Sequence, residues 1–256
     1  MATDNMKIDI METTAQENPA KRYKYYDFVM VGFVVVLLSS NFIGPGKTCV
    51  LDLSWLPLIT GPLVFGAGNL FFPIGYIFGD ILTEVYGFAR ARKVIWAGFG
   101  AMIFASGMAY IIINLTPAPN EPYNDVLQPA LEVVFGNAYR IVIASIIAFW
   151  AGDFVNAYIL AKMKIWTKGK FLWMRTIGST LGGQSVDSLI FYPLAFYGIW
   201  EGKTILAVIV FNCAFKILVE VFMTPITYLI VAFLKKHERV DYYDTETNFT
   251  PFSLKD

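Results

Sequence analysis

The chain has 256 residues and no formal net charge, and 56% of its residues are hydrophobic while only 16% are charged. Soluble domains carry about 25% charged residues, so this composition excludes an ordinary soluble protein. A neutral chain offers no bulk charge for nucleic acid, and we expect no nucleic-acid partner. The two cysteines, Cys49 and Cys213, form neither a CxxC site nor a disulfide framework, and we expect no metal and no cofactor.

Apolar runs long enough to cross a bilayer recur along the chain. A helix needs about 20 predominantly apolar residues to cross a hydrocarbon core of about 30 Å. Residues 48–58 alternate in polarity and are too short for this, so we expect a re-entrant or interfacial segment between the first two spans, which leaves a seventh element open. The sequence predicts an all-α integral membrane protein with six transmembrane helices, at residues 28–43, 63–85, 94–115, 138–161, 173–200 and 204–234.

The basic residues predict the orientation of these spans. Thirteen Lys and Arg residues lie close to the span ends on one side, namely just before the first span, in the loops after the second and fourth, and just after the sixth. The alternate loops carry only Lys47 and Lys203. Because Lys and Arg accumulate on the cytoplasmic side, both termini should be cytoplasmic. We expect a polar, disordered tail at 1–24, one membrane domain at 25–236 and a C-terminal tail at 237–256.

Polar residues inside the predicted spans are the candidates for function. A carboxylate in hydrocarbon costs about 2.5–3.5 kcal/mol even on lenient insertion scales. Asp80 and Glu84 are one helical turn apart and should therefore face protein or a watery cavity. In the fourth span, Asp153 and Asn156 share one face.

Two further stripes of polar residues have helical spacing. Gln184 and Asp187 lie on one face of the fifth span, which opens with Arg175. In the sixth span, Lys216 and Glu220 are four residues apart, so they form either an internal ion pair or a charged cavity wall that moves a proton. Arg175 could equally extend its charge to the cytoplasmic edge. The GxxxG patterns at 75–79 and 178–182 favour close helix packing and leave a homodimer open.

Several segments resemble the queuosine precursor transporter family, also called the vitamin uptake transporter family. The main one is 72–87, Phe-Pro-Ile-Gly-Tyr-Ile-Phe-Gly-Asp-Ile-Leu-Thr-Glu-Val-Tyr-Gly; the others are 148–156, 175–187 and 216–225. The resemblance covers about residues 41–236. It implies a multi-pass importer of the bacterial inner membrane that lacks its own ATPase and is not an enzyme. The implied substrates are 7-deazapurines, namely 7-cyano-7-deazaguanine, 7-aminomethyl-7-deazaguanine or queuine.

The polar residues suit such a substrate. A 7-deazaguanine presents a ring N–H and an exocyclic amine on one edge, which a carboxylate can accept together; Glu84 or Asp187 is predicted for this role. The remaining predicted site residues would bind the carbonyl and pyrrole N–H, cover a ring face, or line the pocket. They are Gln184, Asn156, Arg175, Phe72, Tyr76, Asp80 and Asp153, with Lys216 and Glu220 as a coupling or structural pair.

Other classes of function remain alternatives. The chain could be the substrate-capture subunit of an importer driven by a separate ATPase. An intramembrane enzyme is disfavoured because the only histidine, His237, lies outside the spans and HExxH is absent. A channel would carry rings of selectivity groups, whereas these polar residues fit one pocket in one protomer. The sequence leaves open whether transport is proton-coupled or facilitated.

Overall fold

The computed structural model describes residues 23–43, 48–51, 63–66, 71–135, 139–199 and 201–253. Within these ranges the chain forms seven helices and one antiparallel pair of strands. The elements in chain order are α2 (Tyr26–Phe42), β1 (Thr48–Leu51), β2 (Leu63–Gly66), α3 (Phe72–Tyr86), α4 (Phe88–Asn114), α5 (Asn124–Phe135), α6 (Tyr139–Trp166), α7 (Leu172–Phe196) and α8 (Gly202–Glu238).

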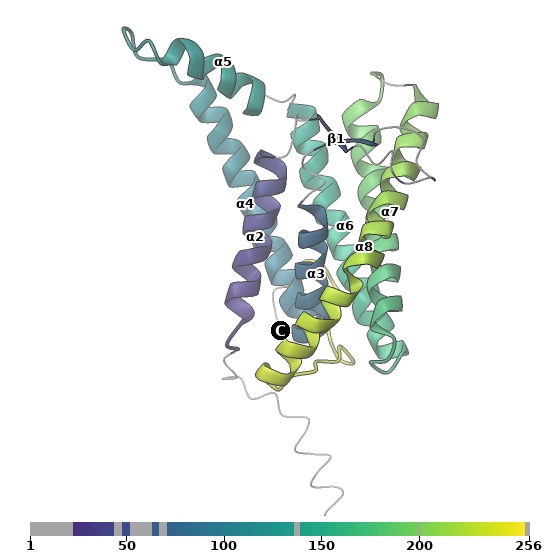
Figure 1. The fold of residues 1–256 in the computed structure, drawn as a ribbon. Helices are drawn as coiled ribbons and strands as arrows, with labels where there is room; N and C mark the ends of the chain where they lie inside the picture. Colours follow the sequence, from purple (N-terminus) through teal and green to yellow (C-terminus); the bar gives the residue numbers. More distant parts are fainter. Residues whose placement is uncertain are drawn as a thin grey trace, which may run out of the picture.

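The helices form an elongated bundle (Figure 1). Helices α2, α3, α4, α6, α7 and α8 run along one direction, while α5 lies across one end. The start of α2 and the C-terminal segment lie at the opposite end, which we call the tail end. The strand β1 lies near the other end, which we call the hairpin end.

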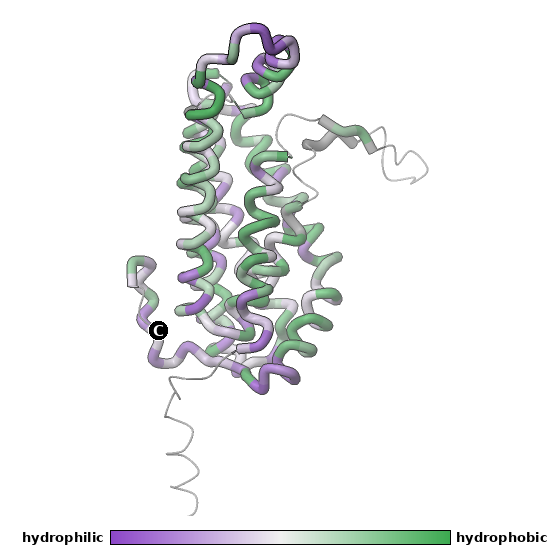
Figure 2. Tube along the Cα trace, turned by 90° about the vertical axis from the view of Figure 1, so that its left-hand side faces the viewer, coloured by the Kyte–Doolittle hydropathy of each residue, from purple (hydrophilic) through white to green (hydrophobic). Residues whose placement is uncertain are grey.

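The helix lengths and their hydropathy identify a membrane protein. Among the described helices, Phe88–Asn114, Arg140–Trp166 and Gly202–Glu238 are long and apolar enough to cross a membrane, and Tyr26–Phe42 is a shorter apolar helix. Hydrophobic residues dominate the length of the bundle, and hydrophilic residues are concentrated at its two ends (Figure 2). The prediction of a helical membrane protein is therefore confirmed. The number of membrane crossings, and the side of the membrane on which each terminus lies, stay predictions.

The predicted start of the second span, at residue 63, is wrong. Leu63–Gly66 is strand β2, which pairs with β1 so that Thr48 lies opposite Gly66. The β-branched and aromatic residues of this short segment favour a strand. Helix α3 begins only at Phe72, with Pro73 in its first turn, where its missing N–H leaves no helical bond unmade. Residues 52–58 of the predicted interfacial segment, and 1–22 of the predicted tail, lie outside the described residues.

Three other elements differ from the predicted spans. Helix α5 was not predicted from the sequence; with 12 residues, and Pro129 among them, it is too short for a membrane span. Helix α7 ends at Phe196, with Pro193 in its last turn. Helix α8 has 37 residues and therefore a length of about 55 Å. It contains Pro225 and changes direction along its length (Figure 1), as proline-containing helices do.

The core centres on α3, whose last two turns are buried on all sides. Ile81, Leu82 and Val85 are at most 2% exposed. Gly87 alone separates α3 from α4 and has φ 87°, a conformation that favours glycine. A Cβ at Gly87 would also lie 2.2 Å from the ring of Tyr242 in the C-terminal segment. This glycine therefore allows both the sharp turn and the packing of the tail against it.

Candidate functional site

A cavity of about 290 Å³ opens between α2, α3, α6, α7 and α8, toward the hairpin half of the bundle. Its walls come from helices that are distant in sequence, and they combine aromatic side chains with polar ones. The residues that line it are Phe33, Val36, Leu37, Ser40, Asn41, Phe71, Gly75, Tyr76, Ser145, Phe149, Gly152, Asp153, Gln184, Asp187, Phe191, Tyr192, Asn212 and Lys216.

The polar wall of this cavity is built by α7 and α8. Lys216 Nζ donates to Gln184 Oε1 at 2.5 Å and to Asp187 Oδ2 at 3.4 Å. Lys216 and Gln184 are less than 10% exposed, whereas the side chain of Asp187 is 25% exposed. The lysine therefore fixes both α7 side chains and leaves a carboxylate accessible at the cavity surface.

Small residues bring α6 and α7 close enough to form this wall. A Cβ at Gly183 would lie 2.8 Å from the carbonyl oxygen of Gly152, and a Cβ at Gly152 would lie 2.9 Å from Cβ of Asp187. Helices approach this closely only where a side chain is absent. The two glycines therefore set the position of Asp187 relative to α6.

Aromatic side chains cover the other walls. Tyr76 on α3 is almost fully buried, and Phe191 and Tyr192 on α7 form an edge-to-face pair with centroids 5.1 Å apart. Phe149 on α6 contacts Phe33 on α2, with centroids 6.4 Å apart. Such rings offer planar apolar surfaces to a flat ligand.

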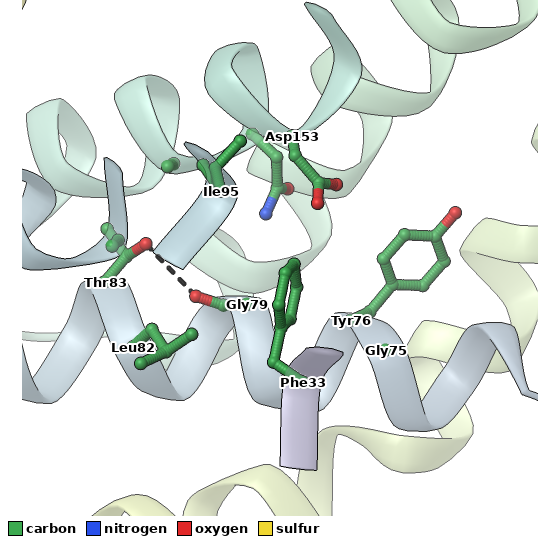
Figure 3. A pocket seen from close by; sticks show the side chains of 11 residues that line it. Phe33, Gly75, Tyr76, Gly79, Leu82, Thr83, Ile95 and Asp153 are labelled. Atoms are coloured by element: carbon green, nitrogen blue, oxygen red, sulfur yellow. Dashed lines mark hydrogen bonds between the residues drawn. The ribbon is translucent and has the colours of Figure 1, made fainter. Parts of the chain in front are cut away.

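A narrow recess of about 10 Å³ adjoins the cavity, with room for about one water. Asp153 and Tyr76 line both spaces, and Figure 3 shows both side chains at the recess, with Thr83 hydrogen-bonded to the carbonyl of Gly79 at 3.1 Å. Asn156 also lines the recess, and its Nδ2 donates to Asp80 Oδ1 at 3.2 Å. The amide of Asn156 thus links Asp80 to the recess that adjoins the cavity.

Glu84 lies in a different environment, an ion cluster at the tail end. Its Oε1 accepts from Arg175 Nη2 at 2.8 Å and from Lys235 Nζ at 2.7 Å. Lys164 Nζ lies 3.6 Å from the same oxygen. Glu84 is fully buried, and its three cationic partners come from α6, α7 and α8. The cluster therefore joins four helices at this end.

The C-terminal segment completes the ion cluster. Asp241 Oδ1 lies 2.6 Å from Lys164 Nζ and 2.7 Å from Lys235 Nζ. Partial burial raises the pKa of Asp241, but hydrogen bonds from the two lysines outweigh it, and the net pKa is lowered. Asp244 accepts from the backbone N–H of Phe88 at 3.0 Å, at the first turn of α4. Carboxylates are stabilised there by unpaired N–H groups and by the helix dipole.

The same segment continues along α4. Arg92 Nη1 donates to the carbonyls of Asn248 and Thr250 at 2.6 and 2.8 Å, and Trp96 Nε1 donates to the carbonyl of Pro251 at 2.8 Å. Residues 239–253 therefore pack against the tail end of the bundle and do not extend away from it.

The structure brings some of the predicted site residues together and separates others. Tyr76, Asp153, Gln184, Asp187 and Lys216 line the cavity, and Asn156 and Asp80 adjoin it. In contrast, Glu84 and Arg175 belong to the ion cluster. The side chain of Phe72 lies outside the described residues.

Lys216 and Glu220 do not form the hydrogen-bonded pair that their spacing suggested. Lys216 donates to α7, and neither carboxylate oxygen of Glu220 has a hydrogen-bond partner among the described residues. The reason is geometric, because the lysine side chain turns toward the cavity, where Gln184 and Asp187 offer oxygen acceptors.

Several residues of the cavity wall were not predicted from the sequence. Asn41 on α2 accepts from Ser145 Oγ on α6 at 3.1 Å, and both line the cavity. Their polarity inside predicted spans was the signal that could have identified them. Phe149 and Tyr192 carried no such signal, because aromatic residues also pack in cores and face lipid.

These features define a helical membrane protein with an internal polar cavity of ligand size. The family profile described as "Putative vitamin uptake transporter" matches residues 66–230. The chain therefore belongs to the vitamin uptake transporter family. That membership confirms the resemblance seen in the sequence and supports a transport role.

Curated relatives carry a narrower name. The chain is 29% identical over 213 residues to the "Probable queuosine precursor transporter" of Bacillus subtilis, which covers 83% of this chain and 86% of the relative. It is 24% identical over 181 residues to the "Queuosine precursor transporter" of Escherichia coli, with 69% and 71% coverage. No solved structure matches the chain at a significant level.

Proposed function

We propose that this chain imports a queuosine precursor, a 7-deazaguanine base, across the bacterial inner membrane and binds it in the cavity of about 290 Å³. One observation carries the proposal. Lys216 holds the oxygens of Gln184 and Asp187 on a single wall, beside aromatic side chains. The names of the relatives support the substrate class.

The polar wall complements the edge of a 7-deazaguanine. The exposed carboxylate of Asp187 would accept the ring N–H and the exocyclic amine together, in charge-assisted hydrogen bonds. Because Gln184 Oε1 already accepts from Lys216, its amide nitrogen is oriented to donate, and the base carbonyl is its natural acceptor. Tyr76 and Phe191 would cover the ring faces.

Size and charge restrict the substrate further. Ligand pockets commonly span about 300–1,000 Å³, so a cavity of about 290 Å³ suits a single bicyclic base better than a nucleotide. Of the charged residues that the structure describes, two acids, Asp153 and Asp187, and one cation, Lys216, line it. This balance disfavours phosphates and suits neutral or cationic bases, including one with an aminomethyl group.

Binding to the purified chain tests the proposal. Ligand that binds only the native state raises apparent stability by about 2.7 kcal/mol at a hundredfold excess over Kd. We expect 7-cyano-7-deazaguanine, 7-aminomethyl-7-deazaguanine or queuine to raise the unfolding temperature, and guanine and adenine to raise it less. A folded sample that responds to none of the three would contradict the proposal.

Uptake into proteoliposomes tests whether the chain works alone. We expect labelled precursor to enter vesicles that contain only this chain and no ATP. Binding without any entry would instead favour a substrate-capture subunit that needs an ATPase partner.

A further inference from the structure

Two buried carboxylates lie behind the cavity, on helices α3 and α8. Asp80 and Glu220 are both 0% exposed. Asp80 Oδ2 and both carboxylate oxygens of Glu220 have no hydrogen-bond partner among the residues that the structure describes. Of the neighbouring charges that act on Asp80, that of Glu220 is the strongest. The two acids therefore lie in one enclosed region of the bundle, on helices that pack against each other.

The cations of this region are directed elsewhere. Lys216, one turn from Glu220, donates to Gln184 and Asp187. Arg175 and Lys235 bind Glu84 at the tail end. Among the described residues, the side chain that donates to the acid pair is the neutral amide of Asn156, at 3.2 Å from Asp80.

Two neighbouring buried carboxylates cannot both carry a charge unless something positive binds them. Within the described ranges, no group of three or more His, Cys, Asp or Glu residues is placed to hold a metal ion. A proton needs no such set of ligands, because a single carboxylate oxygen binds it. The arrangement is therefore suited to binding a proton.

We propose that Asp80 and Glu220 form a proton-binding site that couples precursor import to the proton gradient. The inference rests on the proposed transport function for its coupling role. One proton enters from the cavity, is held between the two carboxylates while the base is bound, and leaves at the other side of the membrane. With a neutral base, each cycle moves one positive charge.

The route from the cavity to this site is short. Asp153 lines both the cavity and the recess, Asn156 lines the recess, and Asn156 contacts Asp80. Apolar residues of α2 and α4, including Phe33 and Ile95, close the recess on its other side. The titratable groups that act on Asp80 besides Glu220 are Glu84 on α3 and Asp153 on α6. Tyr76 on α3 is near Glu220, Asp153, Asp187 and Cys213, and Lys216 is one turn from Glu220 on α8.

Transport by the full chain in proteoliposomes tests the coupling. An inward proton gradient should drive the wild type to accumulate labelled precursor several-fold above equilibrium, and a protonophore should abolish the accumulation. Asp80→Asn and Glu220→Gln, which mimic the protonated acids, should keep precursor binding within about twofold and keep exchange of internal for external precursor. Both variants should lose accumulation driven by the gradient.

The matched control is Glu132→Gln on α5, whose carboxylate is remote from the cavity and bonds Gln128. It should accumulate precursor like the wild type. Accumulation by Glu220→Gln at the wild-type level would overturn the inference. So would a wild type that exchanges precursor but ignores the proton gradient, or one that responds to a sodium gradient instead.

A readout without substrate separates this inference from the proposed function. Infrared spectra of the purified chain at neutral pH should show the C=O stretch of a protonated carboxylic acid, weakened in the double variant Asp80→Asn and Glu220→Gln. Absence of the band in the wild type, or full retention in the double variant, would overturn the proton site. If the wild type bound no precursor and still showed this band, the proposed substrate would fail and the proton site would stand.

Discussion

Asp80 and Glu84 are one turn apart on α3, yet they lie in opposite environments. Glu84 has three cationic partners from three other helices, whereas Asp80 has one amide and a second acid as neighbours. Both are fully buried. The difference shows that a buried acid in a membrane span is informative only together with its partners. Glu84 joins helices, whereas Asp80 has no cation bound to it among the described residues.

The largest expected effect separates these two acids directly. Glu84→Gln leaves Arg175, Lys164 and Lys235 without their shared carboxylate, and breaking a buried ion pair costs about 3–5 kcal/mol. Thermal unfolding in detergent should show a strong loss of stability. Asp80→Asn is the matched control and should unfold within a few degrees of the wild type. Equal losses of stability in the two variants would contradict the different environments assigned to Glu84 and Asp80.

The next effect tests the contact that shapes the cavity wall. Gly183→Ala places a Cβ 2.8 Å from the carbonyl oxygen of Gly152, so α6 and α7 must separate. Overpacking of this kind costs about 1–3 kcal/mol, and we also expect weaker precursor binding because Asp187 shifts. Gly107→Ala, where the added Cβ meets no atom within 4 Å, should leave both stability and binding unchanged. Unchanged binding in Gly183→Ala would show that the wall tolerates displacement.

A smaller effect on stability, with a specific effect on binding, is expected at the cavity. Gln184→Ala removes the amide beside Lys216 and should weaken precursor binding by up to about tenfold, the equivalent of one hydrogen bond between neutral groups. Ser185→Ala is the matched control, since Ser185 Oγ bonds Leu181 of its own helix and lies outside the cavity lining. Calorimetric titration of both variants with the precursor measures the difference.

The smallest effect is expected where the ion cluster meets solvent. Asp241 is 45% exposed, so Asp241→Asn should cost less than about 1 kcal/mol. Because the folded-state pKa of Asp241 is lowered, its contribution is present above the unfolded-state pKa of about 4 and is lost as pH falls through the folded value. The stability difference between variant and wild type should therefore disappear in acid. A difference that grows in acid would contradict the assigned ion pairs.

Much of the helical fold could be predicted from the sequence, because long apolar runs have few alternatives in a bilayer. The start of α3 could not, since the apolar residues 63–66 suit a strand as well as a span. The partners of Glu84 were equally hidden: they lie 80 to 151 positions away in the chain, and only the packed bundle brings them together. Helical spacing did place Gln184 and Asp187 on one face, and both line the cavity.

An experimental structure of the chain with a bound 7-deazaguanine precursor tests most directly whether the cavity binds the substrate. We expect density for the base in the cavity, with Asp187 and Gln184 within hydrogen-bond distance of its polar edges. We also expect Glu84 to keep its cationic partners. Density for the base against Glu84 and Arg175, with the cavity unoccupied, would contradict the central claim.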